Sequence, residues 1–125
     1  MAKLKGGITV RMGRGTGEMD TSALSQDDYF RALDTYAYCA TPADIVISDE
    51  GDPFNSRILG LGGIVGGEDT GCDEGTTDIL IECAYFDPLT IRRTAKRLSV
   101  NSDAKYRFER GVDTGFLLGL SLIHI

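Results

Sequence analysis

Glycine crowds one short stretch in the middle of the chain. It occupies six of the twelve positions from Gly60 to Gly71. Such a density gives up backbone entropy and is tolerated where positive φ or a close backbone approach is needed. The stretch therefore predicts a tight turn that something approaches closely. A plain turn between strands has the same composition, and the two interpretations are compatible because a tight turn can form the wall of a pocket.

The segment after this turn carries one carboxylate among aliphatic residues. Its side chains alternate from Asp78 to Ala84, which predicts a strand. The two expected faces are Ile79, Ile81 and Cys83 on one side and Leu80, Glu82 and Ala84 on the other. A carboxylate on such a surface is unusual, so Glu82 is a candidate functional residue. The alternative is a carboxylate that points to solvent or pairs with an arginine.

Length and charge limit the class of protein. A chain of 125 residues is long enough for one domain with one core. Its formal net charge of -6 argues against nucleic-acid binding by a surface that is basic throughout. Positive charge concentrates between Arg92 and Arg110, so any contact with a polyanion belongs there. A solvated helix face explains the same residues, and we predict only a weak phosphate-steering role.

Cysteine and histidine usage excludes several kinds of site. The three cysteines form no C-x-x-C pair, so neither a zinc site nor a disulfide framework is indicated, and we interpret them as core residues of a protein in a reducing cytosol. The only histidine lies in the last residues of the chain, which leaves no Ser-His or Cys-His pair and no metal cluster. No apolar run has the length of a membrane span, and the N-terminus lacks the apolar core of a signal peptide.

Phosphate-binding motifs are also absent. A Walker loop needs Lys and Ser or Thr after its last glycine, but Gly67 is followed by Glu68 and Asp69. The dinucleotide pattern G-x-G-x-x-G, started at Gly60, fails at Val65. We therefore expect no cofactor in this domain.

The remaining pattern predicts a mixture of strands and helices. Alternation predicts strands at Ile8 to Met12, Ile45 to Ile47 and Arg57 to Ile64, while Tyr29 to Tyr38 suits either a short helix or a hairpin. Asp87 as N-cap and Pro88 at the first helical position begin a helix, and Asn101 to Asp103 begin a shorter one that Gly111 closes. Residues 13–29 are predicted to be a surface loop or insertion. The tail from Leu120 to Ile125 has no cap and no period and matches a translated sequencing adapter, so we interpret residues 120–125 as a non-native read-through.

Four motifs carry a resemblance to a known family. They are GGIVGGE at Gly62 to Glu68, TGCDE at Thr70 to Glu74, IECAYFDPL at Ile81 to Leu89, and NSDAKYRFERGVD at Asn101 to Asp113. Together they resemble the editing domain of the bacterial phenylalanyl-tRNA synthetase β subunit, from about Lys3 to Gly115. The resemblance implies an α+β fold, a β-sandwich of unusual topology flanked by helices. It implies a domain over residues 1–119, truncated at its N-terminus, in which residues 13–29 are longer than usual.

The resemblance also implies an activity, the hydrolysis of tyrosine wrongly attached to the phenylalanine tRNA. In the family pattern Glu82 accepts a hydrogen bond from the tyrosine hydroxyl, Gly66 and Ala104 keep room for the aminoacyl group, and Ser102 lines the pocket. A hydrogen bond to a charged acceptor contributes roughly 1.5–3 kcal/mol, enough for about tenfold selectivity or more. The family histidine lies upstream of the position matched by Met1. We therefore expect no catalytic residue within the chain and little activity from it alone.

The same resemblance implies the wider context. It implies tRNA(Phe) and the α subunit as partners in a cytoplasmic α2β2 heterotetramer, with no membrane, and ATP and Mg2+ as the needs of the other domains of the ligase. A non-catalytic structural or tRNA-docking module that kept the fold is the alternative.

Overall fold

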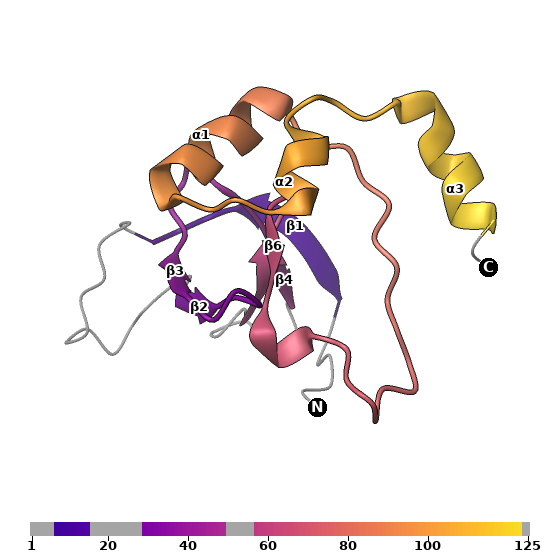
Figure 1. Cartoon of the computed structure of the whole chain (residues 1–125), viewed down its shortest axis with the longest axis horizontal. Helices are drawn as coiled ribbons and strands as arrows, with labels where there is room; N and C mark the ends of the chain where they lie inside the picture. Colours follow the sequence, from indigo (N-terminus) through magenta and orange to yellow (C-terminus); the bar gives the residue numbers. More distant parts are fainter. Residues whose placement is uncertain (1–6, 16–28, 50–56, 124–125) are drawn as a thin grey trace.

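The computed structural model describes residues 7–15, 29–49 and 57–123, and it combines antiparallel sheets with helices (Figure 1). The predicted α+β class is therefore confirmed. The strands are β1 (Ile8–Met12), β2 (Tyr29–Arg31), β3 (Ala37–Cys39), β4 (Ile45–Asp49), β5 (Arg57–Leu61) and β6 (Val65–Gly66). The helices are α1 (Pro88–Leu98), α2 (Asp103–Phe108) and α3 (Leu117–Ile123), with 3-10 turns η1 (Glu68–Thr70) and η2 (Thr114–Phe116).

Two sheets carry the first half of the chain. One has the order β1-β4-β5-β6, and all its neighbouring strands are antiparallel. The other is the hairpin β2-β3, which joins β6 through a bridge between Ala32 and Gly67 and a hydrogen bond from Leu33 N to Gly66 O of 3.0 Å. Of the two predictions for Tyr29 to Tyr38, the hairpin is therefore confirmed. Its turn places Thr35 at a φ of 71°.

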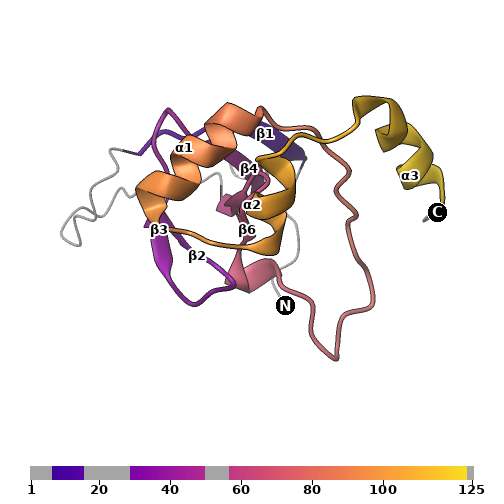
Figure 2. The same cartoon turned by 45° about the horizontal axis from the view of Figure 1, so that its top comes forward.

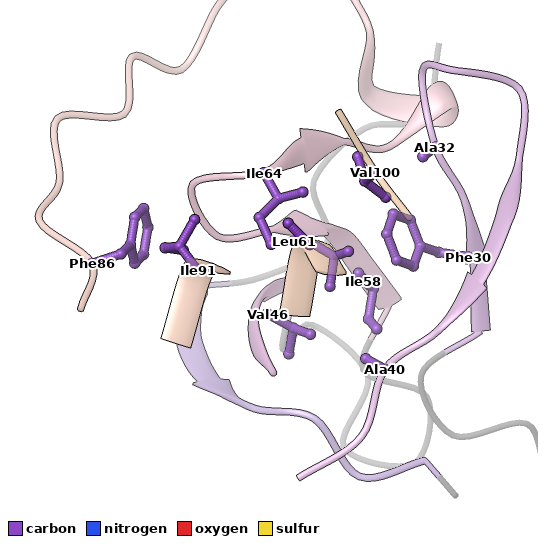
Figure 3. Packing of buried hydrophobic residues seen from close by; sticks show 11 residues of the cluster. Phe30, Ala32, Ala40, Val46, Ile58, Leu61, Ile64, Phe86, Ile91 and Val100 are labelled. Atoms are coloured by element: carbon purple, nitrogen blue, oxygen red, sulfur yellow. The ribbon is translucent and has the colours of Figure 1, made fainter. Parts of the chain in front are cut away.

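The core lies between these sheets and the first two helices. Figures 1 and 2 show α1 and α2 side by side against the strands. Apolar residues from both halves form one buried cluster, with Phe86 and Ile91 at one end and Phe30 at the other (Figure 3). Helix α3 stands apart from this body in both views. Its backbone is helical across Leu120, where the tail was expected to have no period, and the interpretation of that tail as a read-through stays a prediction.

The predicted helix starts are confirmed, and both have polar caps. Asp87 accepts hydrogen bonds from Thr90 N (2.8 Å) and from the Thr90 hydroxyl (2.7 Å), and these bonds lower the pKa of its carboxyl. Because the folded-state pKa is lowered, this contribution to stability is present above the ordinary pKa and is lost as the pH falls through the folded value. Helix α2 begins after Ser102, whose hydroxyl accepts from Lys105 N at 3.1 Å.

A fully buried carboxylate fastens α1 to the strands. Asp44, just before β4, accepts hydrogen bonds from Thr41 N (2.7 Å), the Thr41 hydroxyl (3.0 Å) and the Thr94 hydroxyl (2.7 Å). It also forms an ion pair with Arg97. Arg97 is exposed, as expected for a solvated helix face, and its guanidinium is in addition paired with this buried acid.

The strand predicted from Asp78 to Ala84 is not present. Residues 71–87 leave the body after η1, run as an extended segment and return at the start of α1 (Figure 1). A strand requires a neighbour for its backbone N–H and C=O groups, and within the described ranges no strand pairs with this segment. As a result Ile79, Leu80 and Ile81 are exposed.

Two of the cysteine assignments change for the same reason. Cys72 and Cys83 lie on this segment and are exposed, so their interpretation as core residues is wrong, while Cys39 is half-buried. Most of the insertion predicted at residues 13–29 lies outside the described residues.

Candidate functional site

The glycine-rich turn is packed against aromatic and aliphatic side chains. Gly63 has a φ of +69°, and a Cβ placed there would lie 2.9 Å from Phe86 and 3.0 Å from Ile91. Gly62 donates its N–H to Ile45 O at 2.9 Å, and a Cβ on it would lie 2.8 Å from Phe86. The close approach predicted from composition is therefore real. In this turn the approaching groups belong to the protein's own core.

Gly66 sits in a more open place, at the end of β6. It is exposed, and a Cβ added to it would meet only the Leu33 side chain, at 3.3 Å. Its carbonyl is held by the N–H of Leu33. Because Leu33 is itself exposed and flexible at its tip, small side chains at position 66 fit after a slight shift. The surface beside Gly66 is therefore bounded by β6 and by Leu33 in the β2–β3 turn.

Ser102, the N-cap of α2, contacts the same turn, and Ala104 lies on that helix. The Ser102 hydroxyl donates to Ile64 O, a carbonyl two residues before Gly66. It also caps α2, so both of its hydrogen-bonding functions are in use. Ala104 is half-buried on the same helix. Three of the four predicted pocket residues thus come from elements joined around Ile64.

Glu82 lies on the exposed segment between η1 and α1. Partial burial raises the pKa of its carboxyl above the ordinary value, although the side chain remains exposed. Among the described residues it forms no hydrogen bond or ion pair. No hydrogen bond or ion pair within the described ranges joins Glu82 to Gly66, Ser102 or Ala104. This segment would have to close over the turn for the four to share one pocket.

Comparison with known proteins identifies the kind of domain. A family model described as the B3/4 domain matches residues 1–119. The chain belongs to the B3/4 domain family. It is similar to proteins named phenylalanine–tRNA ligase beta subunit, with 42% identity over 123 residues in Cereibacter sphaeroides and 43% over 121 residues in Bradyrhizobium diazoefficiens. These matches cover 98% and 96% of the chain, and in each case 13% of the relative. The resemblance found in the sequence is confirmed.

Other features of this B3/4 domain concern ligands and membranes. Within residues 7–15, 29–49 and 57–123, no group of three metal-ligating side chains comes together. None of the helices in these ranges has the length and apolar character that crossing a bilayer requires. The roles of Gly66, Glu82, Ser102 and Ala104 stay predictions.

Proposed function

We propose that this B3/4 domain is the editing domain of a phenylalanine–tRNA ligase β subunit and hydrolyses tyrosine attached to tRNA(Phe). One observation carries the proposal. Nearly the whole chain aligns with β subunits of that ligase at 42–43% identity. The motifs around Gly66, Glu82 and Ala104 lie within the aligned chain.

The proposed selectivity rests on one oxygen atom. Phenylalanine and tyrosine differ by a hydroxyl, and an apolar synthetic pocket rejects an isostere with an added hydroxyl only about 100-fold. A second site must therefore reward that hydroxyl. The Glu82 carboxylate accepts its hydrogen bond, and partial loss of water around the carboxylate strengthens such a bond.

The rest of the proposed pocket surrounds the reacting ester. Gly66 leaves space for the aminoacyl group next to Leu33, and Ser102 and Ala104 form the side contributed by α2. Closure of residues 71–87 over this surface brings Glu82 opposite Gly66. Hydrolysis then uses an oriented water and the ribose hydroxyl of the tRNA rather than a protein nucleophile.

The proposal includes the context implied by the family. The domain works in a cytoplasmic α2β2 ligase with the α subunit and tRNA(Phe) as partners. ATP and Mg2+ serve the aminoacylation reaction in other domains.

The test uses the full-length β subunit with its α partner and the Glu82→Ala variant. Deacylation of tyrosyl-tRNA(Phe) should fall about tenfold or more, the value of a hydrogen bond to a charged acceptor, while aminoacylation with phenylalanine stays unchanged. Glu74→Ala is the matched control, because Glu74 is an exposed glutamate on the same segment. Equal deacylation by wild type and Glu82→Ala would remove the proposed role of Glu82.

A second candidate function is a non-catalytic structural or tRNA-docking module. The exposed position of Glu82 favours it. Gly66→Trp separates the two candidates. If the domain edits, the indole fills the pocket, and the variant loses deacylation but keeps aminoacylation. If the wild-type complex itself does not deacylate tyrosyl-tRNA, the docking module is supported.

A further inference from the structure

We propose that the outward faces of helices α1 and α2 form a binding surface for an RNA strand with unpaired bases. We call it the α1–α2 face, and it consists of Arg92, Arg93, Lys96, Tyr106, Arg107 and Arg110. It rests on the proposed function only for the identity of the RNA, a tRNA. The surface itself follows from charge, exposure and ring geometry.

Charge is segregated along this chain. Residues 88–112 contain seven lysines or arginines and two acids, a formal charge of +5, within a chain whose formal charge is -6. The two acids are Asp103 and Glu109. A basic surface on an otherwise acidic protein attracts polyanions to that one place.

The helices turn these cations outward on adjoining faces. On α1 the exposed positions include 89, 92, 93 and 96, with Arg97 exposed beside them, and on α2 and its C-terminal end they are 103, 106, 107 and 110. Each set has the i, i+3, i+4, i+7 spacing of one helix face. Arg92 connects the two, because its guanidinium donates to Glu109 O at the end of α2 at 3.0 Å. Figures 1 and 2 show the two helices next to each other on the outside of the body.

Three cations of the α1–α2 face have no hydrogen-bonded or ion-paired acid, although the charge of Arg93 contributes to the lowered pKa of the Asp87 carboxyl. In the described part of the chain Arg93, Lys96 and Arg107 form no hydrogen bond or ion pair. Neighbouring cations differ, since Arg97 pairs with buried Asp44 and Lys105 pairs with Glu109 at 3.2 Å. The face therefore keeps positive charge for a partner.

An aromatic ring lies among these charges. Tyr106 is 56% exposed, and the Arg110 guanidinium is stacked 3.5 Å from its ring centroid. The guanidinium is fixed there by hydrogen bonds to Tyr106 O (2.7 Å) and Glu109 Oε1 (3.3 Å). A fixed, exposed ring with a stacked arginine is a platform for a base, and base stacking on aromatic residues is a main source of single-strand binding. Because the ring adds a stacking surface for a base to the cations that hold phosphates, the pair favours RNA.

The experiment measures binding of tRNA(Phe) to the full-length complex by fluorescence anisotropy over a range of salt concentrations. Arg93→Gln, Lys96→Gln and Arg107→Gln together remove three charges that form no hydrogen bond or ion pair among the described residues. The slope of log K against log salt should become less negative by about 2 to 3, as expected for three phosphate contacts. Tyr106→Ala should weaken binding about fivefold or more at any salt concentration.

Matched controls come from elsewhere on the chain. Arg31→Gln removes an exposed arginine on β2, and Tyr36→Ala removes a tyrosine that is 69% exposed in the β2–β3 turn. Both should leave the affinity and the slope unchanged. An unchanged slope in the triple variant, or an equal effect of Arg31→Gln, would overturn the proposal. If the triple variant no longer assembles with the α subunit but binds tRNA as the wild type does, the proposal is overturned too, because the face would then be a protein interface. If the wild-type complex does not deacylate tyrosyl-tRNA and the triple variant still loses tRNA affinity, this surface is supported and the editing function is refuted.

Discussion

Replacing Asp44 by alanine should destabilise the fold more than any surface substitution. The change deletes the acceptor of three hydrogen bonds and the partner of Arg97. Removing one member of a buried ion pair costs about 3–5 kcal/mol, because the other group is left without its partner. Arg97 is 36% exposed and regains water, so we expect the lower end, about 3 kcal/mol.

Urea unfolding followed by far-ultraviolet circular dichroism measures this loss. With a urea dependence of about 1–3 kcal/mol per molar, the midpoint should fall by about 1–3 M at an unchanged slope. Asp69→Ala is the control, since Asp69 is exposed in η1. Thr94→Val should cause a smaller loss because it removes one of the three hydrogen bonds. A midpoint for Asp44→Ala equal to that of Asp69→Ala would show that this cluster does not hold α1 to the strands.

Two further predictions concern the turn and the hairpin. Gly63→Ala should lower the free energy of unfolding by about 1–3 kcal/mol, because position 63 has a φ of +69° and the new methyl would lie 2.9 Å from Phe86. The control Gly75→Ala, at an open site, should be nearly neutral in the same urea unfolding measurement. Tyr38 should titrate with a pKa of about 12 in absorbance at 295 nm, since burial and its 2.6 Å hydrogen bond to Asp34 disfavour the phenolate. The folded-state pKa is raised, so this contribution to stability is complete below pH 10 and is lost as the pH rises towards 12, and a Tyr38 that ionises near pH 10 would contradict it.

Local signals in the sequence predicted the local parts of the fold. Asp87 with Pro88, and Ser102 before Asp103, mark helix starts through groups a few residues apart, and both starts are where the structure has them. The alternation from Ile8 to Met12 likewise gave a strand. Each of these depends on neighbours in sequence, which is why one sequence was enough.

Contacts between distant residues were not predictable in the same way. Asp44 and Thr94 are 50 positions apart, and the only hint was a charge next to the aliphatic run of β4. In the segment from Asp78 to Ala84, alternation predicted which side chains would share a face but said nothing about a neighbouring strand, and none of the described strands pairs with it.

The roles of the candidate site residues stay predictions, and the structure adds their local contacts. Ser102 reaches the glycine-rich turn through Ile64, as a pocket built from both elements requires. The crowding at Gly63 is explained by Phe86, whose approach could not be read from glycine spacing. Glu82 lies on an exposed segment, and its alternating pattern does not determine what that segment packs against.

The long exposed run between η1 and α1 separates all the described β-strands from all the described α-helices. A protease that cleaved the backbone there would cut one covalent link and leave intact the hydrogen bonds between Thr94 and Asp44 and between Ser102 and Ile64. The two pieces would then behave as a complementing pair, able to be made separately and reassembled from solution. Breakage of the polypeptide and collapse of the molecule are, in this architecture, separate events.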